Sequence, residues 1–129
     1  MSALRALYKG GLVLEEKAED LGRVLGQTEE YKALRRATEA LREDQAVQKV
    51  LAEAEQLAQE IERVAQQGNE PTKEQVEQYD RALQSVQANS VYQQMVAAQA
   101  NFEKLMARIN ARIYEGIKKG AASPIITLG

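Results

Sequence analysis

Apolar residues recur at alternating intervals of three and four along most of this 129-residue chain. That spacing puts them on one face of an α-helix, which restricts the chain to amphipathic helices packed against one another. The stripes comprise Val47, Val50, Ala54, Leu57, Ile61 and Val64; Val76, Tyr79, Leu83 and Val86; and Tyr92, Met95, Val96, Phe102, Leu105, Met106, Ile109, Ile113 and Ile117. We therefore expect an all-α bundle of about five long antiparallel helices.

The N-terminal part of the pattern predicts a helix from about Leu12 to Leu25, after a break at Gly10-Gly11. Residues 1–11 are then an N-terminal extension, residues 12–119 a single helical domain, and residues 120–129 a C-terminal tail. The side chains expected to face inward on this helix are Ala18, Leu21, Val24 and Leu25.

Capping residues divide the rest of the domain into helices. Thr28 is expected to cap a second helix, and Asp44 either caps a third helix or marks a bend within one long helix. We expect the third helix to end at Gln67, because Gly68 supplies a left-handed cap. Further capping boxes are predicted at Thr72 with Gln75 and at Ser90 with Gln93, and the last helix should end near Lys119.

The composition argues against most catalytic chemistry. The chain contains no His, Cys or Trp, so it lacks the commonest general base, the best metal ligands and the thiol nucleophile. The many carboxylates are best interpreted as solvated helix faces. We accordingly expect no catalytic residues, no metal and no cofactor. No export signal is visible, so the cytoplasm is the expected location.

Charge is unevenly distributed along the chain. Six acidic residues accompany Lys49 alone between Glu43 and Glu62, whereas five basic residues accompany Glu115 alone between Lys104 and Lys119. Lys104, Arg108 and Arg112 step by four and share one helix face. They form the candidate docking face for a partner, with RNA phosphates as one alternative ligand and simple solvation of the helix as another.

The last apolar stripe is too wide for one neighbouring helix to cover, because it contains adjacent apolar pairs. A second copy of the chain is a natural source of the additional covering surface, so we expect a homodimer. The candidate packing and oligomer interface consists of Tyr92, Met95, Phe102, Met106, Ile109 and Ile113.

The order of several motifs resembles the YlbF/YmcA family of bacterial proteins. The motifs, from N- to C-terminus, are Thr28-Glu29-Glu30-Tyr31, Leu34, Leu41, Asp44-Gln45-Ala46, Gly68-Asn69-Glu70-Pro71, Asn89-Ser90-Val91-Tyr92, Phe102-Glu103-Lys104-Leu105, Ile109-Asn110 and Ile113. The resemblance covers about Leu14 to Ile117. It implies an all-helical, oligomeric, non-enzymatic cytoplasmic regulator that assembles with other proteins and acts through ribonuclease Y in mRNA processing.

The chain departs from this family in one respect. Some members are associated with iron–sulfur clusters through cysteines, and this chain has none, so the resemblance does not extend to cluster binding.

Taken with the resemblance, the sequence leads us to expect a regulatory adaptor. A helical nucleic-acid-binding module using the Lys104, Arg108 and Arg112 face is the alternative, and an enzyme with a carboxylate metal site comes last.

Overall fold

The computed structural model describes residues 2–122, with side chains from residue 12 onward. Five helices are present: α1 (Ser2–Gly26), α2 (Glu29–Glu43), α3 (Gln45–Gln66), α4 (Lys73–Ala88) and α5 (Ser90–Ala122). No strand occurs within these residues. The all-α fold expected from the stripes is confirmed.

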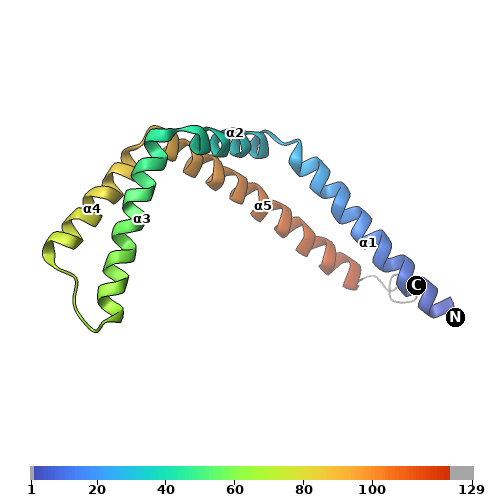
Figure 1. Ribbon diagram of the computed structural model, residues 1–129. Coiled ribbons are helices and arrows are strands. Elements are labelled where there is room, and N and C mark those ends of the chain that lie inside the picture. The colour runs from blue at the N-terminus through green and yellow to red at the C-terminus, as the bar shows by residue number, and fades with distance from the viewer. Residues whose placement is uncertain (1, 123–129) are drawn as a thin grey trace.

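The helices form two packed pairs that meet at an angle. α2 packs along the first half of α5, and α3 packs along α4. The α3–α4 hairpin occupies one end of the resulting arch, whereas α1 and the second half of α5 extend toward the other end (Figure 1). The polypeptide passes between the two pairs twice, once at Asp44 and once at Asn89.

These two passages are built alike, each from a single residue in an extended conformation. The Asp44 carboxylate accepts a hydrogen bond from Val47 N at 2.9 Å, and the Asn89 side chain accepts one from Tyr92 N at 3.0 Å. Each side chain caps the helix that follows it. Asp44 therefore caps α3 and also ends α2, which decides between the two alternatives left open by the sequence.

A glutamine one turn into each new helix reinforces the passage. Gln48 donates from Nε2 to the Leu41 carbonyl at 2.9 Å, and Gln93 donates to the Gln87 carbonyl at 2.7 Å. The expected capping box of Ser90 with Gln93 is therefore wrong. Asn89 takes the capping role because its side-chain oxygen Oδ1 accepts from the backbone amide of Tyr92, the third residue of α5. The Gln93 side chain is already bound to a carbonyl at the end of α4.

The helix ends predicted at Thr28, Gly68 and Thr72 are confirmed. Thr28 accepts from Tyr31 N at 3.2 Å, and Thr72 with Gln75 makes both hydrogen bonds of a capping box. Gly68, at φ 79°, adopts the left-handed conformation that ends the α3 region. These local features fix the length of the α3–α4 hairpin.

The core is small and is distributed along the two pairs. Its buried apolar residues are Val47 and Ala54 of α3, Val86 of α4, and Ala98 and Leu105 of α5. Alanine and valine make up four of these five residues. No residue type in this core offers chemistry beyond packing.

Three expectations for the ends of the chain are wrong. α1 continues through Gly10-Gly11 without a break, because glycine weakens a helix by about 1 kcal/mol per residue without forbidding it. For the same reason α5 continues past Gly120 to Ala122. Ala18 and Val24 do not face inward but are exposed, because α1 contacts mainly α2, at the junction of the two helices.

Candidate interaction surfaces

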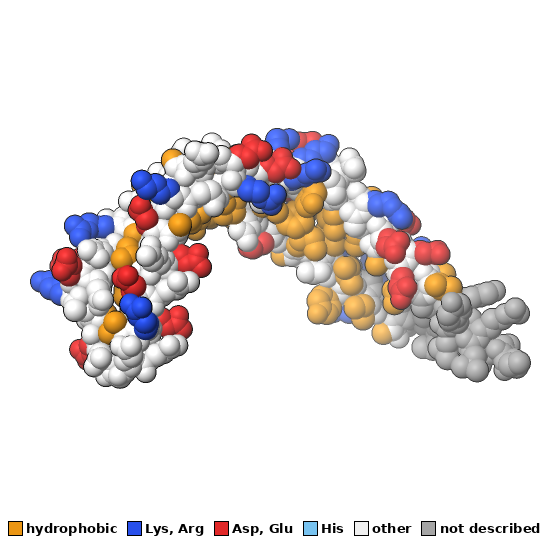
Figure 2. Space-filling model, viewed as in Figure 1, with side chains coloured by type: hydrophobic (Ala, Val, Ile, Leu, Met, Phe, Trp, Pro, Cys, Tyr) orange, Lys and Arg blue, Asp and Glu red, His pale blue; other side chains and the backbone are white. Residues whose placement is uncertain are grey.

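α1 and the second half of α5 carry large apolar side chains that the chain itself does not cover. Leu14 is 71% exposed, Tyr114 66% and Ile117 58%. Hydrophobic side chains gather on the underside of the arch, where α5 extends below α1 (Figure 2). The exposed set is Leu12, Val13, Leu14 and Val24 on α1, with Ile113, Tyr114 and Ile117 on α5.

Sequence reasoning identified only part of this surface. Ile113 belonged to the candidate oligomer interface, and Ile117 lay on the predicted stripe. The exposed residues of α1 were missed, because helical periodicity shows which face of a helix is apolar without showing whether the same chain covers it. Leu12, Val13 and Leu14 form an unbroken apolar run at the expected start of the helix, and that run is the signal that could have identified them.

The candidate oligomer interface divides in two within the fold. Its first part packs inside the chain: Phe102 of α5 contacts Tyr31 of α2 with ring centroids 5.7 Å apart and planes tilted by 58°. Tyr92, Met95, Met106 and Ile109 are half-buried, whereas Ile113 is exposed. Most of the wide stripe is thus partly covered by the chain itself, and the distal part is left open.

The basic docking face lies beside carboxylates of α2. Lys104 and Arg108 line an open groove of about 750 Å³ together with Glu29, Glu30 and Asn101. Arg108 Nη2 lies 3.4 Å from Glu30 Oε2, the one ion pair between different helices among the described residues. Arg108 therefore helps to hold α5 against α2, although exposure of the pair limits its strength to about 1 kcal/mol or less.

The remaining member of the basic face lies farther along α5. Arg112 is exposed and makes no ion pair within the described residues. Its position places it on the half of α5 that also carries Ile113 and Ile117. The three basic residues share a helix face as predicted, but they meet different surroundings.

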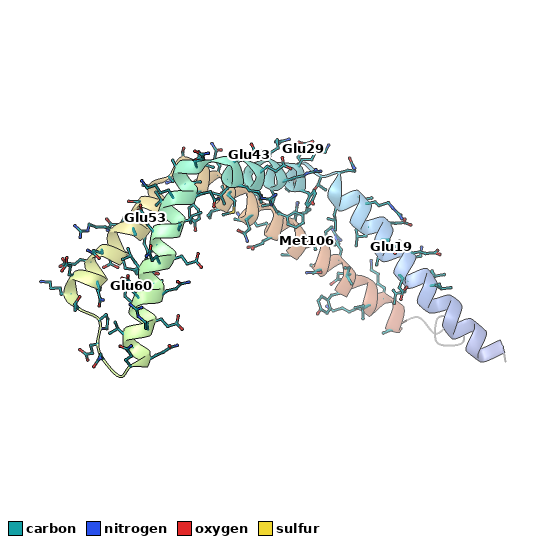
Figure 3. The ribbon with its side chains drawn as sticks, viewed as in Figure 1. Glu19, Glu29, Glu43, Glu53, Glu60 and Met106 are labelled. Atoms are coloured by element: carbon teal, nitrogen blue, oxygen red, sulfur yellow. The ribbon has the colours of Figure 1, made fainter. Side chains whose placement is uncertain are left out.

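A second groove, of about 530 Å³, lies between α3 and α4. Its lining is mixed in polarity: Glu53, Gln56, Leu57, Glu60, Gln78, Arg81, Ala82 and Ser85. Glu53 and Glu60 project from α3 (Figure 3), and Arg81 of α4 lines the same groove. It is a solvated seam between paired helices.

Other kinds of site are not found among the described residues. No group of three or more Asp and Glu side chains there is arranged to hold a metal ion. None of the helices that could be searched has both the length and the apolar character needed to cross a membrane.

Comparison with known proteins places the chain in a family. The sequence model of the family described as "Control of competence regulator ComK, YlbF/YmcA" matches residues 14–118. A UPF0342 protein of Alkalihalophilus pseudofirmus is 23% identical over 109 residues, an alignment that covers 84% of this chain and 92% of the relative. The match spans α2 to α4 completely, together with about half of α1 and most of α5. The chain belongs to the YlbF/YmcA family of regulators of competence.

Proposed function

We propose that this chain is a non-enzymatic regulatory protein of the bacterial cytoplasm that acts by binding other proteins. The observation that carries the proposal is the uncovered apolar surface on α1 and distal α5. Exposed apolar surface of this extent is characteristic of protein interaction sites. The proposed regulatory role is that this chain, bound to its protein partners, modulates mRNA processing by ribonuclease Y.

The nucleic-acid alternative is less well supported by the geometry. Glu29 and Glu30 line the same groove as Lys104 and Arg108, and Glu30 already pairs with Arg108. A phosphate placed between the two basic side chains would lie close to carboxylates and be repelled by them. The basic row also lacks interleaved aromatic residues for stacking of bases.

Deletion of the gene in its native bacterial host tests the proposed role. We expect the maturation or decay of ribonuclease Y-dependent transcripts to change, and ribonuclease Y to be recovered with the tagged wild-type chain. Sequencing of transcript ends after transcription is stopped measures the first effect. Reintroduction of the wild-type gene should restore the original transcript pattern.

Two results would contradict this proposal. Transcripts that are unaffected by deletion would remove the link to ribonuclease Y. Salt-sensitive retention of RNA by the purified chain, lost when Lys104 and Arg112 are changed to Glu, would favour the nucleic-acid alternative. A matched control changes Lys49 and Arg63 of α3 to Glu, which alters the net charge equally at exposed positions of the other helix pair.

A further inference from the structure

The surface area of the chain is larger than its mass requires. The accessible area is 10428 Å² for a chain of 14.3 kDa. A compact monomer of this mass exposes about 6,800 Å². The excess is several times the ~800 Å² that each partner contributes to a standard protein interface. The arch therefore exposes more than enough surface for an interface of ordinary size.

Among the described side chains of α1, those before Leu21 have no packing partner. Every described residue from Leu12 to Asp20 is exposed. A helix in water derives most of its stability from tertiary packing of its apolar face. Of the described side chains, the junction with α2 partly covers only positions between residues 21 and 26 of α1, so residues 12–20 lack such packing in the single chain.

Residues 12–26 of α1 and the distal half of α5 carry opposite net charge, although Arg5 and Lys9 make α1 neutral over its whole length. Between Leu12 and Gly26, α1 has four acidic residues and two basic ones; between Lys104 and Lys119, α5 has five basic residues and one acidic one. Glu15 and Glu16 of α1 make no ion pair among the described residues, and neither do Arg112 and Lys119 of α5. The 12–26 segment of α1 is thus electrostatically suited to distal α5 and unsuited to the same segment of another copy.

We propose that a second copy of this chain covers the open end, with α1 of each copy packed along the distal half of α5 of the other. A two-fold axis makes this contact twice, so that the acidic 12–26 segment of each α1 meets a basic distal α5. Leu14 and Val24 of one copy then face the stripe of Ile113 and Ile117 on the other. The immediate occupant of the basic row at Arg112 is accordingly α1 of the partner copy. The crosswise dimer does not depend on the proposed regulatory role.

Charge exchange between the two helices tests the crosswise arrangement. One variant carries Glu15→Lys and Glu16→Lys, and the other carries Arg112→Glu and Lys119→Glu. All four positions are exposed, so both variants should retain the helicity of the wild type, as checked by circular dichroism. In each variant alone, both crosswise contacts join like charges.

We expect wild-type protein to give a light-scattering mass of twice 14.3 kDa at micromolar concentration. For each variant alone, the dissociation constant of the dimer should be about tenfold higher than for the wild type, or more. An equimolar mixture of the two variants should form a heterodimer of wild-type affinity, because both of its contacts then join opposite charges. The chain carrying all four changes should dimerise like the wild type.

Several results would overturn the crosswise dimer. A wild-type chain that is monomeric at 100 μM leaves the open end for another occupant. Unaltered dimerisation of both variants shows that these helices do not meet across the interface. Weakened variants that are not rescued on mixing show that the changed charges do not pair across the interface. Variants that dimerise as the wild type does alone, but more tightly when mixed, show α1 paired with α1, or α5 with α5, because such contacts join like charges in the wild type as well. None of these results bears on transcript processing, so this proposal and the proposed function fail separately.

Discussion

Leu105→Asp is expected to destabilise the fold by about 4 kcal/mol or more, a large part of the stability of a domain this size. Leu105 is 8% exposed and lies on α5, in the helix that packs along α2. The change removes about 2–3 kcal/mol of apolar burial and places a carboxyl where no basic partner is buried. Urea unfolding followed by circular dichroism measures the effect.

The pH dependence of this variant has a defined sign. Burial raises the pKa of the introduced carboxyl in the folded state above its unfolded value. The protonated form is therefore tolerated better, and the destabilisation relative to wild type should shrink as the pH falls toward 4. Val96→Asp is the matched control, because Val96 lies on the same helix but is 43% exposed. Equal destabilisation of the two variants would contradict the core assignment.

Replacing Ile113 and Ile117 together with aspartate is expected to raise the dissociation constant of the dimer by about 100-fold or more. Both side chains are roughly half exposed in the single chain, so dimer formation gains about 1 kcal/mol from each, and a carboxylate there would be desolvated without a partner. Sedimentation at a series of concentrations measures the shift, and Val96→Asp serves again as the control.

The same double variant should keep the two helix pairs folded. α2 with the first half of α5, and α3 with α4, make their contacts away from these positions. Loss of helicity in parallel with loss of mass would show that Ile113 and Ile117 stabilise the single chain. A dimer of undiminished affinity would place the interface elsewhere.

Local chemistry made most of the helix ends predictable. Thr28, Asp44 and Thr72 cap helices because a side-chain oxygen lies within reach of a backbone amide three residues later, wherever the helix is placed. The cap of α5 was harder to predict, because the adjacent residues Asn89 and Ser90 are both of a type that caps helices. Gly10-Gly11 was misjudged because its cost to helix formation is small and local.

The candidate surface was less predictable than the fold, because it depends on where elements end in space. The pattern of α5 identified Phe102 and Ile113 as apolar alike. Phe102 packs against Tyr31 of α2, whereas Ile113 lies farther along α5 and is exposed. Likewise, the spacing of Lys104, Arg108 and Arg112 placed them on one face, but the pairing of Arg108 with Glu30 required the antiparallel packing of α2 on α5.

Hydrogen exchange of the α1 backbone amides at two protein concentrations tests the central claim most directly, since residues 12–20 of α1 are all exposed in the single chain. At a concentration well above the dissociation constant, the amides of residues 12–26 should be strongly protected. After dilution below it, they should exchange much faster while the core amides around Val47 stay protected. Protection of α1 that is the same at both concentrations, or absent at both, would contradict the account.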